Sequence, residues 1–413
     1  MTIAQQVQKI AQAAPLLAGA CAEKKNAFLE AAALALLEGT EGILAENAAD
    51  LEAARATGMS PSMQDRLRLT PERVAAMARS AREIAALPDP VGRVLADYQN
   101  AAGLRIRKVS VPFGVVGIIF EARPNVSVDA GLLCFKSGNG VLLRGGREAY
   151  RSNAALIGIL RRVLKEQGFP EDLIRLVDDT SRESASAMMA AESGLDLLIP
   201  RGGKSLIERV VNEARVPVIA TGVGNCHIYV DKAADPEMAI AIVHNAKVSR
   251  PSVCNAAETL LIHREIAPAL LPRIAEDLWR AGVQLRGDER ARAICPEMIP
   301  ATEEDFATEY NDLILSVGVA DDLEAALSHI ARYSTRHSEC IVTQNDEAAA
   351  RFLAAVDAAA VYHNASTRFT DGGEFGLGAE IGISTQKLHA RGPMGLDELN
   401  TYKYLVEGTG QVR

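Results

Sequence analysis

The sequence is poor in aromatic residues and lacks long apolar runs. Phenylalanine, tyrosine and tryptophan make up 4% of its 413 residues, and there is a single tryptophan. Alanine-rich helices must therefore supply much of the packing. No apolar run reaches the roughly 18 residues of a membrane-spanning helix. The N-terminal segment that begins at Met1 lacks the basic and apolar regions of a signal peptide. The sequence predicts neither a membrane protein nor a secreted one.

Cysteine is scarce and irregularly spaced. The six cysteines form no Cys-x-x-Cys pair and no Cys/His spacing typical of zinc, so no metal site is expected. Scattered thiols in a chain of this length indicate a reducing compartment, and we expect a cytoplasmic protein. Most of these cysteines are expected to be small buried residues. The six are Cys21, Cys134, Cys226, Cys254, Cys295 and Cys340.

Positive charge is in deficit. The chain has 44 lysines and arginines against 53 aspartates and glutamates, so its formal net charge is −9. This argues against a nucleic-acid-binding surface, whose affinity comes mainly from neutralising phosphates. It does not exclude an anionic small molecule, because a local arginine cluster can override the net charge. The length predicts two or three lobes rather than one core.

The first 90 or so residues have a helical pattern. Gln5–Leu37 and Glu41–Arg55 carry apolar residues at helical spacing. The segment 60–62, Ser-Pro-Ser, is expected to interrupt the helices. Thr70-Pro71 begins another helix with a cap and a proline in the first turn. Pro88-Asp89-Pro90 ends this section.

A single alternating segment follows. Leu104–Val111 alternates apolar and polar residues, which predicts a half-exposed strand. With the preceding Tyr98–Gly103 it could form a hairpin that projects from the body, or it could be an edge strand of the main sheet. The pattern leaves both possibilities open.

From Val115 onward, short apolar strands alternate with helices. This alternation predicts an α/β protein with parallel, doubly wound sheets. The strands fall into two series, so we expect two packed lobes with a cleft between them. The first series is Val115–Phe120, Val141–Leu143, Ile174–Val177, Leu195–Ile199 and Val218–Ala220. The second is Ile228–Val230, Thr259–Ile262, Leu313–Val317, Ile341–Thr343 and Ala360–Tyr362.

Two glycine motifs resemble nucleotide-binding fingerprints but are incomplete. The run 202–205, Gly-Gly-Lys-Ser, ends like a P-loop, yet Leu198 stands where the first glycine is required. This argues against a P-loop kinase. The run 222–224, Gly-Val-Gly, begins like the dinucleotide fingerprint, but His227 replaces its third glycine. Tight turns are the simpler explanation of these glycines.

Two basic glycine turns follow predicted strands. One consists of Arg144, Gly145, Gly146 and Arg147, and the other of Arg201, Gly202, Gly203 and Lys204. The second turn opens a helix, whose first N–H groups suit a diphosphate. Turns at the carboxyl ends of parallel strands form a nucleotide crevice. Although the glycines could be purely structural, the four cations favour a bound dinucleotide, and NADP over NAD.

Cys254 has an unusual setting for a cysteine. It lies in a polar loop between a predicted helix and the strand Thr259–Ile262. Positive neighbours and hydrogen-bond donors lower the pKa of a thiol, and the thiolate is the nucleophile. Local chemistry leaves an inert cysteine and a catalytic one both open. Cys226 is the rival thiol, but its position before Ile228–Val230 predicts burial. The polar neighbours of Cys254 are Lys247, Arg250, Ser252 and Asn255.

Four segments carry a resemblance to a known family. They are Phe120–Asn125, Ser249–Ala256, Glu309–Leu313 and His329–Ile341. The second is similar to the catalytic-cysteine segment of the γ-glutamyl phosphate reductases, which belong to the aldehyde dehydrogenase superfamily. The fourth resembles their signature, with its H-I-x-x-[HY]-[GS]-T and H-S-E elements. The similarity runs from about Leu16 to the C-terminus in the same order and spacing.

The resemblance implies an aldehyde-dehydrogenase-like fold, with two doubly wound α/β domains and a small oligomerisation arm. Residues 1–97 and 113–228 would bind NADPH, and residues 229–363 would form the catalytic domain with Cys254. The arm would comprise residues 98–112 and about 388–413, which favours the projecting hairpin. The resemblance also implies a homodimer or homotetramer. A complex with glutamate 5-kinase, which makes the labile acyl phosphate, is compatible with channelling.

The resemblance also implies a reaction. The Cys254 thiolate would attack the acyl carbon of L-glutamyl 5-phosphate, and phosphate would leave. Hydride from NADPH would then reduce the thioester to L-glutamate 5-semialdehyde, the second step of proline biosynthesis from glutamate. Hydrolytic aldehyde dehydrogenases carry a glutamate base in Glu-Leu-Gly-Gly, where this chain has Thr221 and the following Gly-Val-Gly. Its absence fits a reductive enzyme, which must avoid hydrolysis.

Further roles follow from the same resemblance. The backbone N–H of Cys254 and a side-chain donor, Asn125 or Arg123, would stabilise the oxyanion. Glu309 would hold the nicotinamide ribose. Another acylating semialdehyde dehydrogenase and a non-catalytic nucleotide-binding module are the alternative functions. Candidates for binding the phosphate or the glutamyl carboxylate are Arg250, Ser252 and His337, the last with packing as its alternative.

Overall fold

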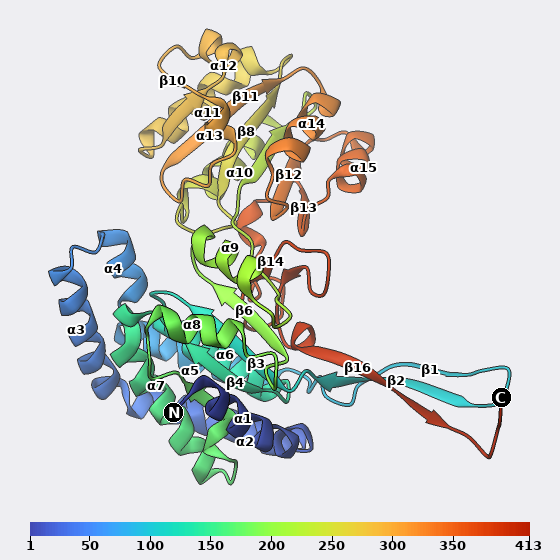
Figure 1. Cartoon of the computed structure of the whole chain (residues 1–413). Coiled ribbons are helices and arrows are strands. Elements are labelled where there is room, and N and C mark those ends of the chain that lie inside the picture. Colours follow the sequence, from blue (N-terminus) through green and yellow to red (C-terminus); the bar gives the residue numbers. More distant parts are fainter.

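The chain folds into two α/β lobes and a projecting arm (Figure 1). The computed structural model describes the backbone of residues 1–413 and every side chain except those of Pro61 and Ser62. None of the helices described is long and apolar enough to cross a membrane.

Five helices form the N-terminal section. The expected helix Gln5–Leu37 is divided at Gly19, which is the C-cap of α1. The helices are interrupted near the predicted place, but at residues 57–60, because Ser60 caps the next short helix by accepting a hydrogen bond from the N–H of Met63. Proline is tolerated in a first turn, where its missing N–H has no helical partner. The helices are α1 Ile3–Ala18, α2 Ala22–Glu38, α3 Thr40–Ala56, α4 Pro61–Leu67 and α5 Pro71–Ala86.

The first lobe is built on a parallel sheet with the strand order β5-β4-β3-β6. The predicted strand Val218–Ala220 is wrong: only an isolated bridge joins Val218 to Leu198. Pro217 lacks an N–H, so it cannot extend the ladder on that side. The strands are β3 Val115–Phe120, β4 Gly140–Arg144, β5 Ile174–Leu176 and β6 Leu197–Arg201. Their helices are α6 Pro124–Lys136, α7 Tyr150–Glu166, α8 Arg182–Met189 and α9 Lys204–Glu213.

The second lobe is built on a parallel sheet with the order β10-β9-β11-β8-β7-β12-β13. The sequence missed the edge strand β10 and its neighbour β9, which are short and have no apolar run. The strands are β7 Cys226–Val230, β8 Ala257–His263, β9 Gln284–Gly287, β10 Ile299–Pro300, β11 Ile314–Ala320, β12 Ser338–Val342 and β13 Ala360–His363. The helices are α10 Pro236–Val248, α11 Ala267–Arg280, α12 Glu289–Ile294, α13 Glu303–Phe306, α14 Leu323–Tyr333 and α15 Asp346–Ala355.

The arm is a three-stranded antiparallel sheet that extends away from both lobes (Figure 1). It consists of β1 Val94–Gln99, β2 Arg105–Pro112 and β16 Asn400–Glu407, with β2 in the centre. The alternating segment is therefore a projecting hairpin strand. Part of the expected C-terminal arm lies elsewhere, since β14 Ile383–Ser384 pairs with β15 Gly392–Pro393. Met394, Leu396 and Leu399 are buried in the core of the first lobe.

A cluster of three phenylalanines lies in the core of the first lobe. Phe28, Phe135 and Phe169 pack together, and the ring centroid of Phe135 lies 4.1 Å from that of Phe28 and 5.0 Å from that of Phe169. Phe135 is fully buried on α6. The cluster joins α2 to the C-terminal end of α6, while the N-terminal end of α6 approaches the candidate site.

We expect Phe135→Ala to lower the free energy of unfolding of the first lobe by about 3–5 kcal/mol, because it removes a buried ring and leaves a cavity. Urea denaturation monitored by circular dichroism measures the change. The matched control is Phe375→Ala, since Phe375 is 45% exposed and its loss should change stability by less than about 0.5 kcal/mol. Equal effects of the two substitutions would contradict the packing role.

Candidate active site

Cys254 borders a cavity of about 260 Å³ to which both lobes contribute. Its loop joins α10 to β8 in the second lobe. The first lobe contributes Arg201, Gly202 and Gly203 to the same cavity. Glu309 of the second lobe also borders it. The cleft predicted between the lobes therefore brings the cysteine, one basic glycine turn and Glu309 together.

Gly224 fixes the position of the cysteine loop. A Cβ atom at residue 224 would overlap the carbonyl group of Cys254, so only glycine allows this approach. The Gly224 N–H donates to Oε1 of Glu309 at 2.7 Å. Cys226 donates from its Sγ to the Cys254 carbonyl oxygen at 3.2 Å. The glycines of the Gly-Val-Gly run at 222–224 therefore allow neighbouring segments, including the cysteine loop, to approach closely.

The pKa of Cys254 is raised to about 11, mainly by burial. The charge of Arg201 lowers it and that of Glu380 raises it, while Glu309 and Arg123 have smaller opposing effects. The prediction of a lowered pKa is therefore wrong, because the cost of burying the thiolate outweighs the nearby cations. Lys247 is engaged elsewhere, since its Nζ pairs with Oε2 of fully buried Glu258 at 2.6 Å.

Four arginines border both the Cys254 cavity and a larger adjoining one of about 500 Å³. Among the described side chains, none of the four forms an ion pair within 4 Å. Burial, together with the charges of Arg201 and Arg66, lowers the pKa of Arg123 to about 10, so it stays charged at neutral pH. This cluster of unpaired cations is suited to an anionic ligand. Its members are Arg66, Arg123, Arg201 and Arg250.

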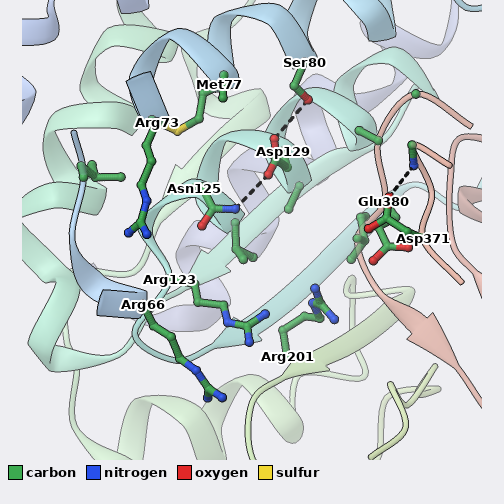
Figure 2. Close-up of a pocket in the computed structure, with 18 of the residues that line it drawn as sticks. Arg66, Arg73, Met77, Ser80, Arg123, Asn125, Asp129, Arg201, Asp371 and Glu380 are labelled. Atoms are coloured by element: carbon green, nitrogen blue, oxygen red, sulfur yellow. Dashed lines mark hydrogen bonds between the residues drawn. The ribbon is translucent and has the colours of Figure 1, made fainter. Parts of the chain in front are cut away.

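Arg66 was not anticipated from the sequence. It lies on α4, far along the chain from Cys254, and Nη2 donates to the carbonyl oxygen of Ser252 at 3.2 Å. No local motif surrounds Arg66 that would have identified it. Figure 2 shows it beside Arg123, with Arg201 nearby.

The two oxyanion candidates lie in different places. Arg123 borders both cavities, whereas Asn125 borders only the larger one. The Nδ2 of Asn125 donates to Oδ2 of Asp129 at 3.2 Å. Ser252 and Arg250 border both cavities. Arg123 is therefore the candidate donor that the structure places beside the thiol.

His337 lies outside the residues that line the two cavities. It is fully buried, and Nδ1 is 2.8 Å from Oγ of Ser338 and 3.8 Å from Sγ of Cys226. Burial lowers the pKa of His337 to about 4, so the ring is neutral. Cys226 is also fully buried, as predicted, and burial raises its pKa. The geometry gives His337 a place in the packing behind the cysteine loop.

The two basic glycine turns flank the carboxyl end of β3, since β4 and β6 are its neighbours. At the second turn, the Gly203 N–H donates to Oε2 of Glu121 at 2.9 Å. This contact shows that the N–H groups at the start of α9 bind a negatively charged oxygen. Lys204 is exposed, with its Nζ 3.9 Å from Glu208.

The first turn does not line either cavity. Nη2 of Arg144 donates to the carbonyl oxygens of Thr180 and Ser181, so this guanidinium fixes the following loop. A Cβ atom at Gly145 would overlap Asn153, and one at Gly146 would overlap Glu148. Both glycines therefore allow close packing.

The signature segment 329–341 supports the site from behind. The N–H of His227 donates to Oε2 of Glu339 at 2.8 Å, and Nδ1 of the same histidine is 3.1 Å from that oxygen. Thr335 accepts a hydrogen bond from the N–H of Asn225 at 2.9 Å. Because Asn225 follows Gly224, these contacts hold the strand on which the cysteine loop rests.

The chain matches the model of the aldehyde dehydrogenase family over residues 4–296. A γ-glutamyl phosphate reductase of Moorella thermoacetica is 57% identical over 98% of this chain and 97% of its own length. One from Enterococcus faecalis is 58% identical over 94% of each chain. The crystal structure of γ-glutamyl phosphate reductase from Thermotoga maritima is 47% identical, with a TM-score of 0.96 over 99% of each chain.

The chain belongs to the aldehyde dehydrogenase family. The two relatives match 98% and 94% of its length. The expected fold is therefore confirmed.

We expect alkylation of Cys254 by iodoacetamide to accelerate by about tenfold per pH unit up to about pH 10, because only the thiolate reacts. Glu380→Gln should shift this profile to lower pH by removing a negative charge. Arg201→Met should shift it to higher pH by removing a positive one. Mass spectrometry of the peptide that contains Cys254 measures the rate.

The variant Cys254→Ala provides the background from the other thiols, including exposed Cys21. A rate that reaches its plateau below pH 8 would show that the pKa of Cys254 is lowered. It would contradict the conclusion that burial outweighs the nearby cations.

Proposed function

We propose that this protein reduces L-glutamyl 5-phosphate to L-glutamate 5-semialdehyde and phosphate with NADPH, through a thioester on Cys254. The observation that carries the proposal is the thiol beside unpaired arginines in a cleft between the lobes. An acyl phosphate brings both the electrophilic carbon and the anion that such a site requires. The relatives named γ-glutamyl phosphate reductase support the same substrate.

Each side chain then has a distinct task. The Cys254 sulfur attacks the acyl carbon, the carbon–oxygen bond to phosphate breaks, and the departing phosphate takes the bond's electron pair and the thiol proton. Arg201, Arg250 and Arg66 bind the phosphate oxygens. Arg123 and the N–H of Cys254 donate to the carbonyl oxygen as it becomes an oxyanion; one such donor contributes about 3 kcal/mol.

The residues present fit a nicotinamide cofactor, which would supply the hydride that reduces the thioester. The start of α9 already accepts the Glu121 carboxylate, so it can accept a diphosphate. Glu309 borders the Cys254 cavity and is suited to a ribose hydroxyl. Arg147, which is exposed beside the first turn, favours NADPH through its 2′-phosphate.

Thr221 occupies the position of the glutamate base found in hydrolytic relatives. Its hydroxyl donates to the Pro200 carbonyl oxygen at 2.8 Å, and the side chain is buried. A threonine held in this way cannot deprotonate water. The thioester is therefore protected from hydrolysis until it is reduced.

The decisive experiment is the reverse assay, in which glutamate 5-semialdehyde reduces NADP only when phosphate is present. Cys254→Ala should lower turnover by more than about 10⁴-fold, because no thioester can form, while NADPH titration still detects binding. Turnover at the wild-type rate would refute the thioester scheme. A higher rate with another aldehyde would favour a different acylating dehydrogenase, and no acyl-enzyme would favour a nucleotide-binding module.

We also propose that the arm joins copies of this chain into a homo-oligomer. The β16 residues Tyr402, Tyr404 and Val406 alternate along the strand, so they share one face. All three are at least half exposed. An isolated three-stranded sheet with an exposed apolar face needs a partner surface. A second copy of the chain supplies one through the same arm.

Tyr404→Glu should convert the oligomer into smaller species, because a charge on this face cannot be buried against a partner. Analytical ultracentrifugation measures the change in mass. Lys403→Glu is the matched control, since Lys403 is on the opposite face of the same strand, and its mass distribution should not change. A wild-type protein that is monomeric at micromolar concentration would refute the assembly.

A further inference from the structure

The larger cavity carries unpaired charges of both signs. Asp129 and Glu380 line it together with Arg123, Arg201 and Arg250. Among the described side chains, none of these five forms an ion pair within 4 Å. Charges in a partly buried site are costly unless a partner compensates them. The cavity therefore matches a ligand that carries both negative and positive groups.

Asp129 is held in place from two helices. Its Oδ1 accepts a hydrogen bond from Oγ of Ser80 on α5, and Oδ2 accepts one from Nδ2 of Asn125 on α6, both at 3.2 Å. Figure 2 shows these contacts. Each carboxylate oxygen keeps capacity for another donor. Burial raises the pKa of Asp129 to about 6, so it is mostly ionised at neutral pH.

The two cavities are contiguous, so a bound substrate can extend from one into the other. Arg66, Arg123 and Arg201 are among the residues that border both. Cys254 borders only the smaller cavity and Asp129 only the larger one. A linear substrate with its acyl group at the thiol therefore extends past the arginines toward Asp129.

Glu380 adds negative charge near Asp129 in the larger cavity. It borders both cavities, and its Oε2 accepts the N–H of Gly372 at 2.9 Å. Burial raises the pKa of Glu380 to about 7, and the charge of Asp129 adds to this effect. The two carboxylates therefore act on a common region of the cavity.

We propose that Asp129 is the specificity residue that binds the α-ammonium group of an amino-acid substrate. The inference rests on the proposed function and extends it to the part of the substrate that does not react. An ammonium supplies three donors and a positive charge, which the Asp129 oxygens accept. The arginines between Asp129 and Cys254 bind the α-carboxylate and the phosphate.

The test compares two aldehydes in the phosphate-dependent reverse assay. Glutamate 5-semialdehyde carries the amino group, and 5-oxopentanoate has the same chain without it. Wild-type protein should prefer the amino compound in kcat/KM. Asp129→Asn should lower kcat/KM for that compound by about 10- to 100-fold, chiefly through KM, because a charged hydrogen bond is lost. Its kcat/KM for 5-oxopentanoate should stay within about threefold of wild type.

Two further variants distinguish a loss of substrate preference from a loss of folding. Ser80→Ala removes one hydrogen bond to Asp129 and should lower the preference by about 3- to 10-fold. Asp65→Asn is the matched control, because Asp65 lines the same cavity at its exposed rim, where it pairs with Arg73. Its preference should equal that of wild type.

Three results would overturn the inference while the proposed function stands. They are a wild type that does not discriminate between the aldehydes, an Asp129→Asn variant that keeps the preference, and an equal loss on both substrates. Failure of the wild type to oxidise either aldehyde with phosphate overturns the proposed function itself, and the inference with it.

Discussion

The contact between Gly224 and the Cys254 carbonyl is the constraint on which the site depends. It occurs where the chain passes from the first lobe into β7, so it ties the cysteine loop to the junction of the two lobes. Glu309 and Cys226 bond to the same pair of residues. The thiol therefore faces Arg201, the last residue of β6, across the cleft. Any side chain at 224 would displace the nucleophile relative to the first lobe.

Burial and charge act in opposite directions on the thiol. Burial raises the pKa of Cys254 to about 11 although Arg201 and Arg123 lower it. The cations therefore serve the anionic substrate more than they activate the sulfur. A thiol that stays protonated without substrate reacts slowly with oxidants, because thiolate character governs oxidation. The raised pKa thus protects the nucleophile from oxidation while no substrate is bound.

The sequence predicted the parallel sheets well because their strands are apolar on both faces, as β3 is throughout. It also predicted the bounds of β3, Val115–Phe120, to the residue. It missed β9, whose alternating burial gives no apolar run. At the site, Cys254 and Arg201 were predicted from local motifs. Residues brought in by other helices and loops carry no local signal and could not be predicted: Arg66, Asp129 and Glu380.

Opposite charges remain apart in one cavity only if rigid elements hold them. Asp129 is on α6, which the packing of Phe135 against Phe28 fixes to α2. Arg201 ends β6, the edge strand of the first-lobe sheet that pairs with β3. The packed helices and the strand ladder fix the backbones of the two residues relative to each other. The ligand must therefore supply the missing counter-charges, and the aromatic residues, though few, stabilise the helix on which that separation depends.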